Sequence, residues 1–251
     1  AGTRVYTTEG VKNIEDLENT EFQIRNLYGN ISKATCWKSG VDEEVLKLNI
    51  KGGHSHTATP KHKWPVWDGE TWVKRRTDQL KPGDKIPNLI SYEMFPDGDK
   101  GTYDDGFIVG WNLGDGWQTY RPNGLQIGFI VGPEDREQGI DKKLEGILSK
   151  LGSSANFQGK DEISVNNSAL RKLFATYGVK HKTEGLPTAV WDSTVSDDFR
   201  RGVIDGLFSA DGSIDIESRR IHFSQSSNKM IRDIASLLGF FGVKTTTRTV
   251  S

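Results

Sequence analysis

Two short stretches decide the fold: Ile108–Gly116, with the sequence IVGWNLGDG, and Ile204–Gly212, with the sequence IDGLFSADG. Each is an apolar helical segment that ends at an aspartate followed by a glycine, which can close a helix in a left-handed conformation. Small residues stand one and five positions before each aspartate, so they share one helix face. Two such helices can pack with their backbones close together. The pairing predicts that Asp115 and Asp211 meet at one end of the helix pair.

Two neighbouring carboxylates repel each other unless a cation lies between them, and hard divalent metals prefer oxygen ligands. We therefore expect Mg²⁺, or another divalent metal such as Mn²⁺, at Asp115 and Asp211. Gly114 and Ala210, which precede the two aspartates, are expected at the same metal. A metal shared by two acids can activate water and stabilise a phosphorane-like transition state, which predicts cleavage of phosphodiester bonds.

The sequence around the first aspartate is repeated around the second. Alternating residues in Trp117–Tyr120 and Leu125–Val131 predict a hairpin, and a helical stripe from Leu144 to Leu151 follows it. After Asp211, alternation in 214–216 and 221–223 predicts a second hairpin, followed by a helix over 230–238. The order of helix, acidic turn, hairpin and helix thus occurs twice. On this logic the second copy is expected to lack its final strand and helix.

The first 90 residues differ in character, with short apolar alternations between turn signals, which predict an all-β domain. We expect a β-rich domain over 1–92, a linker over 93–106, and a repeat domain over 107–251. The first repeat is expected to cover about 107–190, and the second to start at about 191 and remain incomplete. The single cysteine, Cys36, lies in a predicted strand region, where it is expected to be a buried, small apolar residue.

The two aspartate stretches resemble the LAGLIDADG homing endonucleases. The second is a close match, and the first is looser because Trp111 and Asn112 stand at usually apolar positions. The resemblance implies an αββαββα repeat and a Mg²⁺-dependent cut of double-stranded DNA, with the acidic residue of each motif as a metal ligand. The family often places a lysine near the active site, and of the candidates Lys180 and Lys182 we assign this catalytic role to Lys182.

The β-rich half resembles the N-terminal part of an intein, the Hint-type splicing domain. The resemblance rests on Gly2–Gly10, Thr59–His62, Trp67–Trp72 and Leu80–Ile86. It implies that Thr59 and His62 activate the N-terminal scissile amide, with a hydroxyl and an imidazole to polarise it and move its proton. The family's N-terminal nucleophile and its C-terminal blocks are absent from this sequence. We therefore expect that this chain alone does not complete splicing.

Together these features predict an α+β protein, an all-β Hint-like domain followed by a pseudo-symmetric αββαββα endonuclease domain whose second repeat is incomplete. The expected partners are a double-stranded DNA target, the N- and C-exteins of a host protein, and a complementary C-terminal intein fragment. No signal peptide or membrane-spanning run is found, which favours a cytoplasmic protein without a membrane partner. The net charge of −1 is unusual for a DNA-binding protein unless basic residues cluster on one face.

Two alternatives remain at this stage. A Hedgehog-type autoprocessing domain would explain residues 1–90 but not the two aspartate motifs. A LAGLIDADG protein that binds DNA without cutting it would explain the repeat, although the presence of both Asp115 and Asp211 argues against it.

Overall fold

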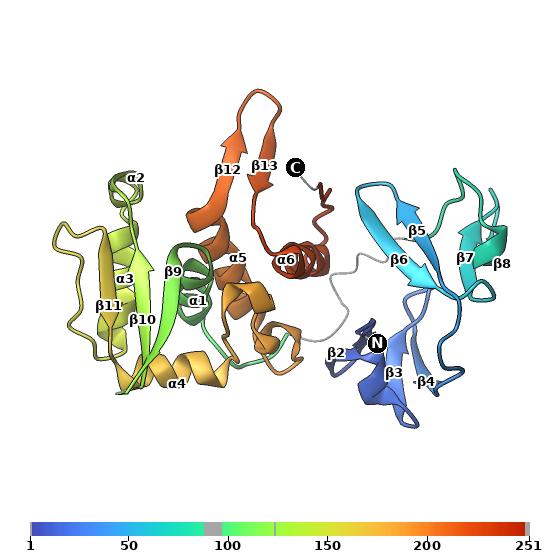
Figure 1. The fold of residues 1–251 in the computed structure, drawn as a ribbon, viewed down its shortest axis with the longest axis horizontal. Helices are drawn as coiled ribbons and strands as arrows, with labels where there is room; N and C mark the ends of the chain where they lie inside the picture. The colour runs from blue at the N-terminus through green and yellow to red at the C-terminus, as the bar shows by residue number, and fades with distance from the viewer. Residues whose placement is uncertain (1, 88–96, 123, 249–251) are drawn as a thin grey trace. The chain divides into compact units, whose positions relative to one another are not determined.

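The computed structural model describes residues 2–87, 97–122 and 124–248. The chain divides into two compact units, one formed by Ala1–Phe95 with Leu238–Ser251 and the other by Pro96–Leu237. Figure 1 shows the β-strands of the first unit and the mixed helices and strands of the second. Part of the predicted linker, residues 93–96, lies outside the described residues. Across the described ranges, no helix combines the length and the apolar character needed to cross a membrane.

The first unit consists of small antiparallel sheets. A four-stranded sheet has the order β2-β1-β3-β4, and β5-β6 and β7-β8 are two-stranded. Short 3-10 turns, η1 (Ile14–Leu17) and η2 (Thr77–Gln79), are the only helical elements in residues 2–87. The strands are β1 (Arg4–Thr7), β2 (Gly10–Asn13), β3 (Glu21–Arg25), β4 (Ile31–Thr35), β5 (Leu46–Ile50), β6 (His54–Ala58), β7 (Lys63–Trp67) and β8 (Trp72–Arg76). The predicted all-β character of this region is therefore confirmed for the described residues, while the Hint fold itself stays a prediction.

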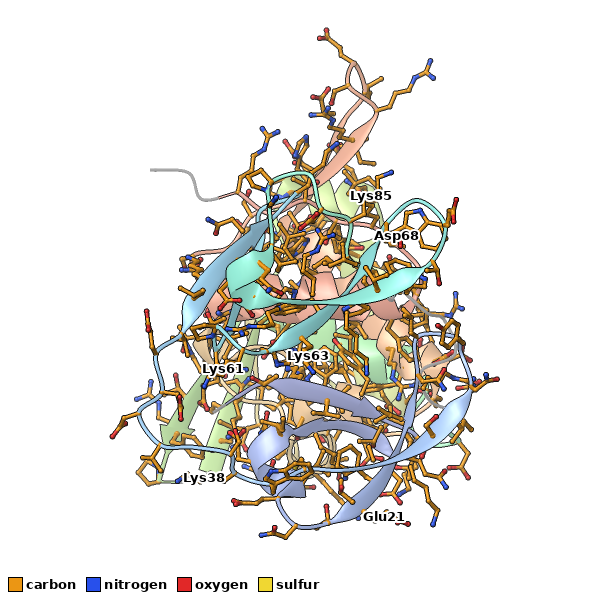
Figure 2. The ribbon with its side chains drawn as sticks, turned by 90° about the vertical axis from the view of Figure 1, so that its right-hand side faces the viewer. Glu21, Lys38, Lys61, Lys63, Asp68 and Lys85 are labelled. Atoms are coloured by element: carbon orange, nitrogen blue, oxygen red, sulfur yellow. The ribbon has the colours of Figure 1, made fainter. Side chains whose placement is uncertain are left out.

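The turn between β7 and β8 shows how local chemistry shapes these hairpins. Asp68, labelled in Figure 2, begins this turn. Its carboxylate accepts hydrogen bonds from the backbone N–H groups of Glu70, at 2.9 Å, and Thr71, at 2.8 Å. The bond from Thr71, followed by that from Glu70, lowers the pKa of Asp68. On the far side of β7, the Trp67 N–H donates to the carbonyl of Lys85 at 2.8 Å.

Cys36 does not match the expectation of a buried residue. It follows the last residue of β4 and is half-buried, and its thiol donates to the Ile14 carbonyl at 3.4 Å. Cys36 lies just beyond the end of β4, and the alternation that buries every second side chain of a strand ends with the strand. Its thiol is therefore only half-buried.

The second unit contains the two predicted copies. In chain order its elements are α1 (Tyr103–Asp115), β9 (Gly116–Arg121), β10 (Gly124–Ile130), α2 (Pro133–Glu137), α3 (Ile140–Lys150), β11 (Glu162–Val165), α4 (Ser168–Thr176), η3 (Lys182–Glu184), η4 (Thr188–Trp191), α5 (Asp197–Asp211), β12 (Gly212–Asp215), β13 (Arg220–Phe223) and α6 (Asn228–Phe240), whose last residues belong to the first unit. Both predicted hairpins are confirmed, β9-β10 and β12-β13.

Two predictions about this unit need correction. The first helix begins at Tyr103 rather than Phe107, because the Thr102 hydroxyl accepts the Asp105 N–H and the Asp105 carboxylate accepts the Thr102 N–H. Residues 103–106 are therefore helical and do not belong to a linker. In 107–122 and 124–190, the first copy also has three strands, in the order β11-β10-β9, instead of the four that αββαββα implies. Among the described residues, a short helix, α2, separates its hairpin from α3.

The two hairpins have the same register relative to their aspartates. Gly116 pairs with Phe129 in the first, and Gly212 pairs with Phe223 in the second. The next pairs out are Trp117↔Gly128 and Ser213↔His222, followed by Gln118↔Ile127 and Ile214↔Ile221. The pseudo-symmetry predicted from the motifs therefore extends along both strands of each hairpin.

Helices α1 and α5 pack through glycines. A Cβ atom on Gly110 would lie 2.3 Å from the Val203 carbonyl oxygen, and one on Gly206 would lie 2.3 Å from the Phe107 carbonyl oxygen. Gly106 and Gly202, one helical turn earlier, make equally close approaches. These two glycines continue the predicted small-residue faces. Because side chains would hold the backbones apart, the glycines allow the two helix ends to meet.

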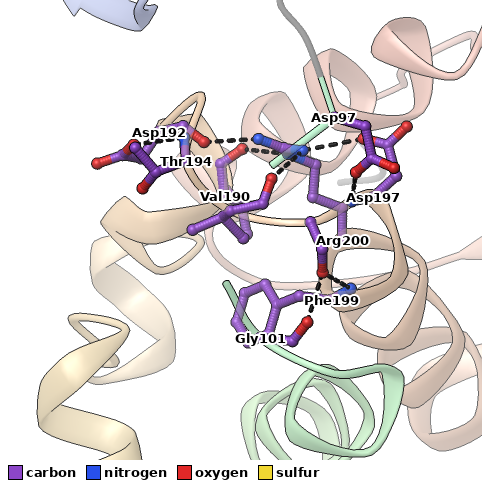
Figure 3. A network of polar contacts seen from close by, with 10 residues as sticks. Asp97, Gly101, Val190, Asp192, Thr194, Asp197, Phe199 and Arg200 are labelled. Atoms are coloured by element: carbon purple, nitrogen blue, oxygen red, sulfur yellow. Dashed lines mark hydrogen bonds and ion pairs between the residues drawn. The ribbon is translucent and has the colours of Figure 1, made fainter. Parts of the chain in front are cut away.

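A buried arginine fixes the segment that enters α5 (Figure 3). Arg200 is fully buried, and its guanidinium donates to the carbonyls of Val190 (3.0 Å), Val195 (2.8 Å) and Asp192 (2.6 Å). It also pairs with the Asp197 carboxylate at 2.9 Å. A planar group with five donors in a fixed fork can satisfy these four acceptors at once, whereas the compact ammonium of a lysine has only three donors. The network sets where α5 starts and thereby where Asp211 ends it.

Candidate active site at the paired aspartates

Asp115 and Asp211 are the last residues of α1 and α5, and each is followed by the first residue of a hairpin. A Cβ atom on Gly114 would lie 2.5 Å from the Cβ of Ala210 and 3.4 Å from Oδ2 of Asp211. The structure therefore brings together all four residues that were predicted at the metal. The close approach depends on the absence of a side chain at Gly114.

The environment of Asp115 disfavours its charged form. Burial first, and then the charges of Asp211 and Asp135, raise the pKa of Asp115 to about 6, while Lys182 acts in the opposite direction. The half-buried Asp115 therefore takes up a proton far more readily than an exposed aspartate. A cation placed between the two carboxylates would relieve the repulsion.

Lys182 lies at this end of the helix pair. Its ammonium group donates to the Gly114 carbonyl at 3.1 Å. Lys180 is placed differently, because its ammonium pairs with Glu184 at 3.5 Å and its carbonyl accepts a hydrogen bond from Gln118 at 3.4 Å. Of the two predicted candidates, Lys182 is thus the lysine beside the aspartates.

Gln225 was not predicted at the site. Its side-chain amide donates to Oδ2 of Asp211 at 2.6 Å, which fixes the orientation of that carboxylate. In the matched registers of the hairpins, Gln225 corresponds to Val131, which is fully buried. The replacement of an apolar residue by an amide at equivalent positions was the signal that could have identified Gln225 from the sequence.

The donor atoms suit a hard divalent metal. Two carboxylates from two helices converge, and oxygen atoms are the ligands that Mg²⁺ and Mn²⁺ prefer. Within the described ranges, no three His, Cys, Asp or Glu side chains gather as a metal-binding group. Asp115 and Asp211 would therefore need further oxygen ligands from backbone carbonyls, water or a bound phosphate. The Gly114 carbonyl already accepts the hydrogen bond from Lys182. This hydrogen bond competes with the predicted binding of the metal at Gly114.

Thr59 and His62 lie in the turn between β6 and β7, where the His62 N–H donates to the Thr59 carbonyl at 3.1 Å. The turn brings the two predicted residues together and leaves the imidazole exposed. Lys61 and Lys63, on either side of His62, are labelled in Figure 2.

Two residues that the sequence analysis did not single out hold His62 in place. The Thr77 N–H donates to the His62 carbonyl at 2.9 Å, and the Trp64 indole donates to the Thr77 hydroxyl at 2.9 Å. The rings of Trp64 and His62 meet edge to face, with 4.9 Å between centroids. These contacts join residues from β7 and η2, which sequence periodicity does not relate.

Comparison with known proteins finds relatives in three differently named groups. The chain is 23% identical to the DNA-directed RNA polymerase subunit Rpo1C of Methanocaldococcus jannaschii, over 85% of the chain and 29% of the relative. It is 24% identical to Protein RecA of Mycobacterium tuberculosis, over 84% of the chain and 27% of the relative. It is 25% identical to the ribonucleoside-diphosphate reductase NrdEB subunit alpha of Bacillus subtilis, over 82% of the chain and 20% of the relative. The chain thus spans less than a third of each relative's length.

The same comparison finds one matching family profile, described as a LAGLIDADG-like domain, at residues 198–251. This range starts one residue after the first residue of α5 and includes β12, β13 and α6. It contains Asp211, Gln225 and the second hairpin. Residues 198–251 therefore match a LAGLIDADG-like domain.

Proposed function

We propose that this chain is the larger part of an intein, in which the N-terminal half of a splicing domain is joined to a homing endonuclease. The endonuclease makes a site-specific, metal-dependent cut in double-stranded DNA. The splicing half carries out the N-terminal acyl shift. The observation that carries the proposal is the convergence of Asp115 and Asp211 at the ends of two pseudo-symmetric helices, beside Lys182.

The relatives support the intein part of the proposal. Their names describe an RNA polymerase subunit, a RecA protein and a ribonucleotide reductase subunit, yet each aligns with most of this chain over a minor fraction of its own length. A sequence that recurs as a minor part of differently named proteins behaves as an inserted element. An intein is such an element, and a Hedgehog-type autoprocessing domain would leave the LAGLIDADG-like residues unexplained.

Each residue of the site has a task in this proposal. Asp115 and Asp211 hold the divalent metal, which when bound supplies Lewis-acid chemistry at the phosphate. Gln225 keeps the Asp211 carboxylate oriented through its 2.6 Å hydrogen bond. Lys182, a cation beside Gly114, balances the negative charge that develops when the phosphodiester bond breaks.

The endonuclease is tested with DNA in which the host coding sequence is joined across the insertion point. We expect Mg²⁺-dependent cutting that EDTA stops, and a loss of at least 100-fold in Asp115→Asn and Asp211→Asn, because each removes a metal ligand. Glu137→Gln, which neutralises an exposed carboxylate on α2, is the control and should cut normally. Full activity in either asparagine variant would refute the metal site. Metal-independent binding without cutting would favour the non-cleaving DNA-binding alternative.

The splicing half is tested after residues that contain a cysteine nucleophile and an N-extein are added before Ala1. Added thiol should then release the extein, and His62→Ala should slow the release at least tenfold, because the imidazole is the proposed proton carrier. His181→Ala, in the other unit, is the matched control. Equal rates of extein release for the parent and His62→Ala would refute the proposed role of His62 in splicing. They would leave the endonuclease proposal unchanged.

A further inference from the structure

The turn that carries Lys182 is too short to hold its own position. It is the 3-10 turn η3, Lys182–Glu184, and a helical turn of this length is not stable by itself. It ends at Gly185, whose φ of 89° lies outside any right-handed helix. The Lys182 ammonium nevertheless donates to the Gly114 carbonyl at 3.1 Å. Contacts from another element must therefore fix the turn.

The start of α6 holds two carbonyls of this turn. The Ser227 hydroxyl accepts the Met230 N–H at 3.2 Å, which caps the helix, and donates to the Thr183 carbonyl at 3.3 Å. The Lys229 ammonium donates to the Glu184 carbonyl. The two segments belong to the same compact unit. The last helix of the second copy thus binds the backbone of the lysine-bearing turn.

Asp233 binds the backbone where the chain leaves the turn. It lies almost fully buried on α6, and its Oδ2 accepts the Leu186 N–H at 2.9 Å. The same oxygen pairs with the Lys229 ammonium, one helical turn earlier, at 3.1 Å. A Cβ on Gly185 would collide with both charged groups, so the backbone lies directly against this ion pair. Burial of a carboxylate is unfavourable unless it is paired, and this one is paired with a cation and with the lysine's own turn.

The connection before α6 also reaches the other side of the site. Gln225 donates to Oδ2 of Asp211 at 2.6 Å, only two residues before Ser227. The segment 225–233 therefore contacts both a proposed metal-binding carboxylate and the turn that carries Lys182. A shift of this segment would change the distance between the ammonium and the carboxylate, and catalysis is sensitive to displacements of about 1 Å.

We propose that Asp233 is a positioning residue for DNA cleavage and that it acts through Lys182. Together with Ser227 and Lys229, it fixes η3 so that the ammonium stays beside Gly114. Asp233 itself contacts neither the metal nor the DNA, because it is buried beneath the turn. The inference rests on the proposed endonuclease and on the role given there to Lys182.

The test is a double-mutant cycle on single-turnover cleavage of the target duplex in Mg²⁺, with the whole chain. Lys182→Met and Asp233→Leu should each slow cleavage about 100-fold, the loss expected when a catalytic group is removed or displaced. Leucine keeps the branched shape of aspartate but cannot accept the Leu186 N–H. The double variant should be no slower than Lys182→Met alone, because the lysine that Asp233 positions is then already absent. Independent structural effects would multiply instead.

Two further measurements separate positioning from loss of folding. Affinity for the same duplex without divalent metal should be unchanged in Asp233→Leu. Asp233→Asn keeps an oxygen that can accept the Leu186 N–H, so it should recover most of the cleavage rate. If Asp233→Leu does not fold, Lys229→Met, which removes a half-exposed cation, replaces it in the cycle. Lys142→Met breaks an exposed ion pair within α3 and is the matched control, which should cut normally.

The outcomes distinguish this inference from the function on which it rests. Losses that multiply in the double variant, duplex affinity that falls together with cleavage, or an Asp233→Asn variant as slow as Asp233→Leu would overturn the inference alone. Normal cleavage in Asp233→Leu would do the same. Normal cleavage in Lys182→Met refutes the role of that lysine and the inference with it. A parent chain that binds the duplex but does not cut it in Mg²⁺ refutes the endonuclease.

Discussion

Asp115 is a residue whose charge responds strongly to its surroundings. Burial, with the nearby Asp211 and Asp135, raises its pKa to about 6 from the 3.8 of an ordinary aspartate. The folded protein therefore binds this proton more tightly than the unfolded chain does. The resulting stabilisation is complete below the unfolded value, near 3.8, and is lost as the pH rises through about 6.

We predict that Asp115→Asn raises the free energy of unfolding at pH 8 by about 1 kcal/mol, an amount reduced for the partial exposure of the carboxylate. At pH 4.5 the parent and the variant should be nearly equal. Urea unfolding of both proteins at several pH values, without divalent metal, measures the difference. If the difference in unfolding free energy between the parent and the variant does not shrink as the pH falls, the protonation of Asp115 is not its cause.

Arg200 makes a prediction about folding rather than activity. Arg200→Leu removes the guanidinium that donates to the carbonyls of Val190, Asp192 and Val195. The Asp192 and Val195 carbonyls each keep one backbone N–H donor, from Val195 and Gly98 respectively. We expect a loss of about 3 kcal/mol or more in unfolding free energy, because the Val190 carbonyl loses the guanidinium donor and the Asp197 carboxylate loses its cationic partner. Arg201→Leu changes the exposed neighbour and should cost less than about 1 kcal/mol. Similar losses in both variants would contradict the role of the network.

At the scale of elements, the contact between α1 and α5 depends on glycine. Alanine is favoured over glycine inside a helix by roughly 1 kcal/mol. At Gly206, however, the new Cβ would lie 2.3 Å from the Phe107 carbonyl oxygen and 2.6 Å from the Trp111 nitrogen. The helices must separate to admit it, and separation also moves Asp211 away from Asp115.

We therefore predict that Gly206→Ala lowers the unfolding free energy by about 2–4 kcal/mol, in the range of other overpacking changes. Gly146→Ala on α3 is the matched control, because its Cβ would meet nothing within 4 Å. It should stabilise the protein by about 0.5–1 kcal/mol. Urea denaturation compares the two, and a stabilised Gly206→Ala variant would contradict the close helix contact.

At the scale of the whole molecule, charge places a condition on DNA binding. The chain has 33 basic and 34 acidic side chains from Lys, Arg, Asp and Glu, a net charge of −1. General attraction to DNA is therefore weak, and binding has to come from local basic groups such as Lys182 beside the paired aspartates. Phosphate contacts of this kind release counterions and make affinity fall with salt.

We predict that affinity for the target duplex falls at least tenfold between 50 and 200 mM salt, as expected when several phosphates are contacted. An unrelated duplex should bind much more weakly than the target duplex at every salt concentration. Fluorescence anisotropy with labelled duplexes measures both. Affinity that does not respond to salt would exclude phosphate contacts as the basis of binding.

The sequence was sufficient for features that depend on local periodicity. The helices that end at Asp115 and Asp211, the two hairpins after them and the strands of residues 2–87 follow from residue patterns within each segment. The small residues before each aspartate also predicted that the two helix ends would meet. Boundaries were less accurate, as the start of α1 at Tyr103 shows. The hydrogen bond that the Thr102 hydroxyl accepts from the Asp105 N–H caps the helix and outweighs the low helix propensity of the two aspartates and the glycine in its first turn.

Only the tertiary structure decided which side chains complete each site. Gln225 reaches Asp211, Lys182 rather than Lys180 reaches Gly114, and Thr77 and Trp64 hold His62. The contact of Trp117 with Gly128 likewise depends on cross-strand register. Sequence periodicity reports which face of its own element a residue occupies. It carries no information about which other element lies opposite that face, and that is set by packing of the whole chain.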